Sequence, residues 1–89
     1  MSEPRAAVRR ADEVEGVDVS AGRGTLRRVL IDPSEAPHFA LRKFTMQPGG
    51  GMPRHTNTVE HEQYVLRGRA RIGIGDEVYE VAADDLSLI

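Results

Sequence analysis

A strict alternation of apolar and polar residues near the C-terminus restricts the fold more than any other feature of this chain. Apolar side chains alternate with arginine and glycine through Arg69–Ile74, and Val78–Val81 resumes the alternation after Gly75-Asp76. A period of two predicts β-strands, and a Gly-X pair between two such segments is typical of a tight hairpin. No segment has the period of a long amphipathic helix.

Shorter apolar segments, separated by turn residues, predict the remaining strands. These are Thr25–Ile31, His38–Gln47, Glu62–Leu66 and Leu86–Ile89. The alternation within His38–Gln47 is imperfect, which indicates a bulge or a local twist. Pro48–Pro53 places three glycines and a methionine between two prolines, and we expect a loop there. Short strands at this spacing predict an all-β antiparallel sandwich or barrel.

The chain length of 89 residues allows one domain. Residues 1–24 mix acidic residues with valine and end in a glycine-rich turn, so we expect an irregular N-terminal arm. Residues 25–89 would then form the β-barrel domain.

Composition excludes several classes of function. A net charge of −2 and only four aromatic residues (two Tyr, two Phe) argue against a nucleic-acid-binding protein. No apolar run approaches the roughly 20 residues that cross a bilayer, so no membrane partner is expected. The absence of cysteine excludes disulfides and thiolate chemistry. The charged N-terminus lacks the apolar segment of a signal peptide, and we expect a cytoplasmic protein.

Arg67, Arg69 and Arg71 recur at every second position. In a strand, their side chains would all point to one face of the sheet. That face is either a solvated outer surface or an anion-binding patch, because the arginine fork matches carboxylate and phosphate groups.

Four side chains in one short window form the candidate metal site. In an extended segment His55 and Asn57 share a face, and so do His61 and Gln63. Imidazole suits Zn, Cu, Fe, Ni or Mn, whereas an amide oxygen is a weak, uncharged ligand. The same alternation turns the neighbouring glutamates away from His61, so no carboxylate joins the set. The alternative interpretation is a group of unrelated polar residues.

The segment Pro48–Gly68 resembles the first motif of the cupin superfamily. That motif is Gly, five residues, His-x-His, three or four residues, Glu, six residues, Gly. Here Gly49 begins the pattern, His55 follows after five residues, and Asn57 stands at the second histidine position. His61 occupies the usual glutamate position, as in the small four-histidine manganese cupins. The resemblance extends over about residues 25–89.

The resemblance implies a double-stranded β-helix, the cupin jelly-roll barrel. It implies a divalent transition metal (Mn, Fe, Ni or Zn) inside the barrel, held by His55 and His61 with Asn57 and Gln63 as secondary ligands. A weak or empty site is the alternative, because Asn57 replaces a histidine. The protein would act on a small molecule as a metal-dependent oxygenase or isomerase. Two alternatives are a non-catalytic module that binds a sugar-like or acidic ligand and a self-associating structural half-barrel.

Two further departures affect the C-terminal part of the barrel. Asp84 stands where the second cupin motif opens with glycine, and aspartate tolerates a left-handed φ better than most residues. The sequence stops at Ile89, before the Pro-x-Gly-x-x-His segment that carries the fourth ligand. We therefore expect a barrel that is incomplete at its C-terminal side. Its unpaired strand edges would favour a homodimer.

Overall fold

The computed structural model of the protein describes residues 7–54 and 60–89. These residues form one short 3-10 helix and seven strands: η1 (Ala11–Glu13), β1 (Gly16–Asp18), β2 (Arg23–Ile31), β3 (Leu41–Gly51), β4 (Glu62–Tyr64), β5 (Arg69–Ile74), β6 (Glu77–Ala82) and β7 (Leu86–Leu88). The all-β prediction is confirmed. In this described part, no helix is long and apolar enough to cross a membrane.

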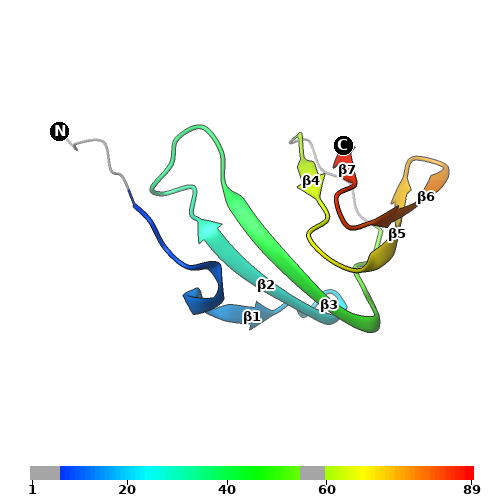
Figure 1. The fold of residues 1–89 in the computed structure, drawn as a ribbon, viewed down its shortest axis with the longest axis horizontal. Coiled ribbons are helices and arrows are strands. Elements are labelled where there is room, and N and C mark those ends of the chain that lie inside the picture. Colours follow the sequence, from blue (N-terminus) through cyan, green and yellow to red (C-terminus); the bar gives the residue numbers. More distant parts are fainter. Residues whose placement is uncertain (1–6, 55–59) are drawn as a thin grey trace. The chain divides into compact units, whose positions relative to one another are not determined.

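The chain forms two compact units, Met1–Pro53 and Arg54–Ile89. The first unit contains the antiparallel sheet β1-β2-β3 (Figure 1). Residues Thr25–Ile31 supply the β-branched and apolar side chains that suit a strand, and β2 includes all of them. The register shifts between Val29 and Ile31, so the irregularity lies on β2 and not within the His38–Gln47 segment, where we predicted it.

We predicted a loop over Pro48–Pro53. This prediction is wrong for Pro48–Gly51, because β3 continues through Gly51. Thr25 pairs with Met46, but Arg23 pairs with Gly51, so β3 contains several more residues than β2 between these two pairs. The extra residues form a bulge in which Pro48 needs no ladder hydrogen bond and Gly49 adopts a φ of +80°. Turn-forming residues therefore bend this strand without ending it.

Part of the segment that we expected to be irregular is also a strand. Residues Gly16–Asp18 form β1, which pairs with the middle of β2. Leu26 packs directly over Gly16, where an added Cβ would lie 2.6 Å from the leucine Cδ2 atom. Glycine at this position therefore allows the two strands to pack closely. The division of the chain into an arm and a barrel domain stays a prediction.

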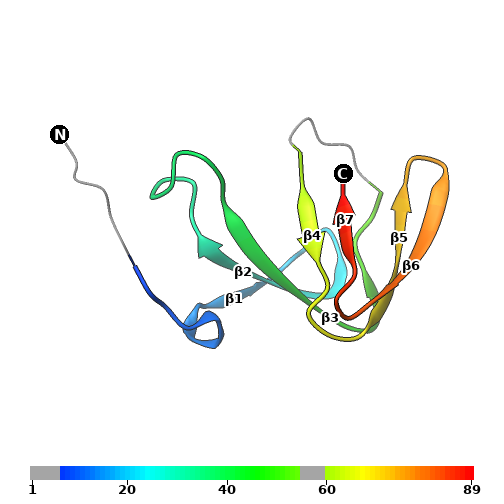
Figure 2. The ribbon, with the colours of Figure 1, turned by 45° about the horizontal axis from the view of Figure 1, so that its top comes forward.

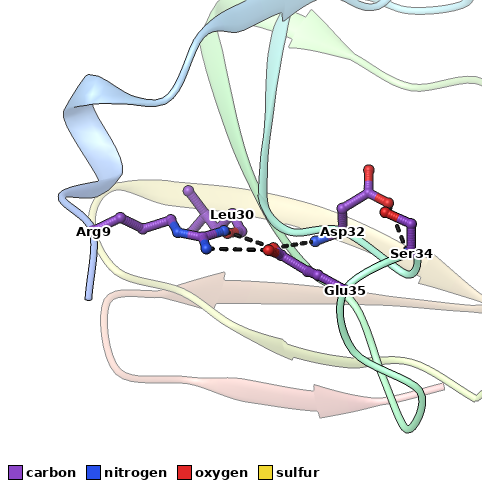
Figure 3. A network of polar contacts seen from close by, with 5 residues as sticks. All are labelled: Arg9, Leu30, Asp32, Ser34 and Glu35. Carbon is purple, nitrogen blue, oxygen red and sulfur yellow. Dashed lines mark hydrogen bonds and ion pairs between the residues drawn. The ribbon is translucent and has the colours of Figure 1, made fainter. Parts of the chain in front are cut away.

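Polar contacts hold the segment before β1 on this sheet (Figure 3). Arg9 donates to both carboxylate oxygens of Glu35, at 2.6 and 3.1 Å, and to the carbonyl of Leu30 at 2.9 Å. Arg28 on β2 donates to the carbonyl of Val14 at 3.0 Å. Glu35 lies in the loop between β2 and β3, so these contacts connect the N-terminal segment to both the loop and the sheet.

The second unit contains two antiparallel strand pairs, β4 with β7 and β5 with β6 (Figure 2). The β5–β6 pair is the hairpin predicted from the alternating pattern. Ile74 pairs with Glu77 across Gly75-Asp76, and Gly75 has the positive φ of +61° that such a turn requires. In contrast, the β4–β7 pair joins segments that are more than twenty residues apart in the sequence.

The described residues contain little buried side-chain area. Within residues 7–54 and 60–89 no hydrophobic side chain is fully buried, and Thr25 is the buried polar residue, with 3% exposed. Its hydroxyl donates to the carbonyl of Arg23 at 2.9 Å, which satisfies the buried group. Many large apolar side chains remain exposed, so the faces of these sheets are available for further contacts.

Candidate metal centre

The β4–β7 ladder positions two of the four predicted site residues. Gln63 lies within β4, directly opposite Ser87 of β7. His61 immediately precedes β4, and its backbone extends the ladder by one more pair. The His61 amide donates to the Ile89 carbonyl at 3.0 Å, and the Ile89 amide donates to the His61 carbonyl at 2.8 Å. The backbone at His61 is therefore as regular as that within the strand.

This register determines which side chains share a face. Residues directly opposite each other in a ladder lie on the same face, and successive residues along a strand alternate. His61 and Gln63 therefore lie on one face with Ser87, whereas Glu62 and Tyr64 lie on the other. The prediction that His61 and Gln63 share a face is confirmed. His61 is half-buried and Gln63 is exposed.

The carboxyl group of Glu62, next to His61 in the sequence, interacts with a second carboxyl group. Glu62 shares a hydrogen bond with the carboxyl group of Glu60, and this contact raises the pKa of Glu62, with loss of solvation as a smaller cause. Like charges in proximity also favour the protonated form. The two carboxyl groups thus interact with each other, and the charge of the nearby His61 acts in the opposite direction by lowering the pKa of Glu62.

His55 and Asn57 lie outside the described residues. Their convergence with His61 and Gln63 therefore stays a prediction. Within the described ranges, no group of three or more His, Asp or Glu side chains is arranged to hold a metal ion. The donors that are described, one imidazole and one amide on one face, suit part of the coordination shell of a divalent transition metal. Two more donors on that side would be needed for a four-coordinate site.

A turn between β6 and β7 fixes the end of the strand that carries Gln63. The amide of Asp84 donates to the carbonyl of Val65 at 2.8 Å, and the amide of Val65 donates to the carbonyl of Asp85 at 2.9 Å. Asp84 has a φ of +72°, as predicted for the residue at the glycine position of the second motif. The turn therefore survives the replacement of glycine by aspartate.

Tyr64 reinforces this turn, and sequence reasoning missed the contact. Its hydroxyl donates to the Asp84 carboxylate at 2.8 Å. The carboxylate acceptor holds the proton on the phenol and raises the pKa of Tyr64, with desolvation adding to the effect. Tyr64 and Asp84 are 20 residues apart, so only knowledge of the β4–β7 pairing could have identified the pair. Ser87, which faces Gln63, was missed for the same reason.

Comparison with known proteins identifies the domain type. Residues 42–89, more than half of the chain, match the family model described as the cupin domain. The match begins within β3 and includes the whole second unit, so it covers the bulge, the candidate ligand window and the β5–β6 hairpin. No curated protein matches the chain.

Proposed function

The chain belongs to the cupin domain family, and we propose that it binds a divalent transition metal through His61 and His55, with Gln63 and Asn57 as weaker ligands. The observation that carries the proposal is the shared face of His61 and Gln63 on the β4–β7 ladder. Backbone pairing on both sides of Gln63 restricts the directions of these two side chains. Such restriction lowers the ordering cost of binding a metal ion.

The chain's own residues suggest how the site would be organised. His61 would supply an imidazole nitrogen, and Gln63 an amide oxygen two residues later on the same face. The Ser87 hydroxyl lies opposite Gln63, where it can donate to the amide oxygen or to a bound water. Mn, Fe, Ni and Zn are all compatible with imidazole ligands. A metal bound there would act as a Lewis acid toward a small-molecule substrate, in oxygenation or isomerisation.

Metal content tests the proposal directly. Protein purified without a histidine tag should bind Mn, Fe, Ni or Zn stoichiometrically after removal of adventitious ions. The variant His55→Ala/His61→Ala should lose this binding. His38 offers a matched control because it is an exposed histidine in the loop between β2 and β3, so His38→Ala should bind metal normally. Equal metal uptake by the double variant and the wild type would disprove the assignment.

A non-catalytic binding module is the second candidate function. The same fold can bind a sugar-like or acidic small molecule without a metal. An empty site in the metal experiment, together with saturable binding of a small molecule, would favour this alternative.

We further propose that the protein forms a homodimer, because three large apolar side chains are exposed on one face of the β4–β7 ladder, which they share with Glu62. Leu86, Leu88 and Tyr64 lie on the face opposite Gln63, with 71%, 65% and 57% of their surface exposed. A second copy of the same face is a suitable cover, since symmetric dimers bury one patch against itself. Sedimentation velocity over a hundredfold dilution tests this, with Leu86→Asp as the disrupting variant. Val8 is exposed but lies in the other unit, so Val8→Asp is the control.

A further inference from the structure

The β5–β6 hairpin carries a small groove lined by charged residues of both signs. Arg69 and Arg71 of β5 share one face with Glu80 and Ala82 of β6, because Arg69 pairs with Ala82 and Arg71 pairs with Glu80. These residues line a groove of about 270 Å³ together with Asp85, from the turn after β6, and with the neighbouring pair Ala70 and Val81. That volume is just below the range of about 300–1,000 Å³ that is usual for ligand pockets, so the groove suits only a ligand of a few atoms.

Three of the four charges in the groove already have a partner. The Arg71 Nε atom lies 3.7 Å from a carboxylate oxygen of Glu80, a distance typical of a loose ion pair between exposed side chains. The Asp85 carboxylate accepts a hydrogen bond of 2.8 Å from the Ala82 amide. Asp85 is therefore held against the end of β6, at the edge of the groove.

Arg69 is the remaining charge. Among the residues that the structure describes, its guanidinium has neither a hydrogen-bond acceptor nor an ion-pair partner. A guanidinium presents parallel N–H donors that match the two oxygens of a carboxylate. The guanidinium N–H groups of Arg69 are therefore available to a carboxylate that binds in the groove.

We propose that this groove binds the carboxylate group of a small organic acid through Arg69. The charge balance of the groove selects the class of anion. Glu80 and Asp85 contribute two negative charges near the site, which would repel a doubly charged phosphate more strongly than a singly charged carboxylate. Ala82 lies opposite Arg69 and provides apolar contact for a short aliphatic tail. The proposal does not depend on the metal site, because it uses none of the metal-site residues.

Propionate is a suitable probe because it combines one carboxylate with a short apolar tail. Titration of the full ¹⁵N-labelled chain at constant ionic strength should give saturable shifts of the Ala82 and Asp85 amide signals. Because the groove is open to solvent, we expect a dissociation constant on the order of 1 mM. Inorganic phosphate at the same ionic strength should give clearly weaker shifts.

Two variants separate specific binding from general charge effects. Arg69→Gln should weaken propionate binding at least tenfold. The dispersion of its amide signals should match that of the wild type, because the substituted side chain is exposed and the fold should stay intact. Arg67→Gln is the matched control because Arg67 is an exposed arginine outside the groove, and it should bind propionate normally. Non-saturable shifts, equal binding by Arg69→Gln, or phosphate binding as strong as that of propionate would overturn the proposal.

Discussion

His61 and Ile89 form a reciprocal backbone pair, in which each amide donates to the other's carbonyl, at 3.0 and 2.8 Å. This pair determines the face on which the His61 side chain lies. The geometry of the proposed metal ligand therefore depends on a residue 28 positions away that contributes no ligand atom.

Ile89→Pro tests this dependence. Proline has no N–H, so the bond from residue 89 to the His61 carbonyl is lost. We expect weaker metal binding although all four proposed ligands are present, and faster hydrogen exchange at the His61 amide because its hydrogen bond to Ile89 loosens. Ile89→Val keeps both backbone bonds and serves as the control. Unchanged exchange at His61 in the proline variant would contradict the role of the pair.

Asn57→His should strengthen metal binding. Asn57 stands at the second histidine position of the cupin motif, two residues after His55. An imidazole is a better ligand than an amide oxygen for transition metals, and we expect a gain of about tenfold, or ~1.4 kcal/mol. Competition titration against a chelator of known affinity measures the change. Unaltered or weaker affinity would show that residue 57 does not contribute to the site.

Gly50→Ala should destabilise the bulge in β3. A Cβ at Gly50 would lie 2.5 Å from the Arg23 carbonyl oxygen and 2.9 Å from that of Gln47. These are backbone atoms, so the clash cannot be relieved by a side-chain rotation, and we expect a loss of about 1–3 kcal/mol in the free energy of unfolding. Urea denaturation measures this loss.

Gly73→Ala provides the matched control for the bulge. Gly73 is also a strand glycine, but a Cβ there would meet no atom within 4 Å. Its substitution should leave the unfolding midpoint unchanged or slightly raised. Equal effects of the two substitutions would show that the close approach at Gly50 does not constrain the strand pair.

The sequence predicts local features of this fold better than distant ones. The β5–β6 hairpin depends on Gly75 and on a period-two pattern, both visible in one short segment. The pairing of β4 with β7 depends on residues such as Gln63 and Ser87, which no local pattern connects. The continuation of β3 through Pro48 was also not predicted. Proline and glycine are common both in turns and in bulges, so the sequence alone does not distinguish the two.

In the candidate site, too, the local features were predictable from the sequence and the long-range contacts were not. Alternation along one strand is local, so the shared face of His61 and Gln63 is predictable from spacing. The Tyr64–Asp84 hydrogen bond depends on which segments become neighbours in the fold, and so does the position of the Arg69 guanidinium beside the groove. Their side-chain types alone carry no such information.

The final prediction concerns the loop between β2 and β3, where acid should disrupt a specific turn (Figure 3). The Asp32 carboxylate accepts a 2.8 Å hydrogen bond from the Ser34 amide, and this bond lowers the pKa of Asp32 below its ordinary value of 3.8. A lowered pKa means that the folded turn favours the charged carboxylate. The turn's contribution to stability is therefore fully present above pH 3.8 and is lost as the pH falls through the lowered value.

Nuclear magnetic resonance can follow this transition at Ser34. The Ser34 amide shift of the wild type should change with an inflection below pH 3.8, as the carboxylate that accepts its hydrogen bond becomes protonated. Asp32→Asn keeps a side-chain oxygen acceptor but cannot titrate, so its inflection should disappear. Asp76→Asn, in the other unit, should leave the Ser34 inflection unchanged. An inflection above pH 3.8, or one that persists in Asp32→Asn, would show that another group controls the turn, since the hydrogen bond to Ser34 can only shift the Asp32 titration downward.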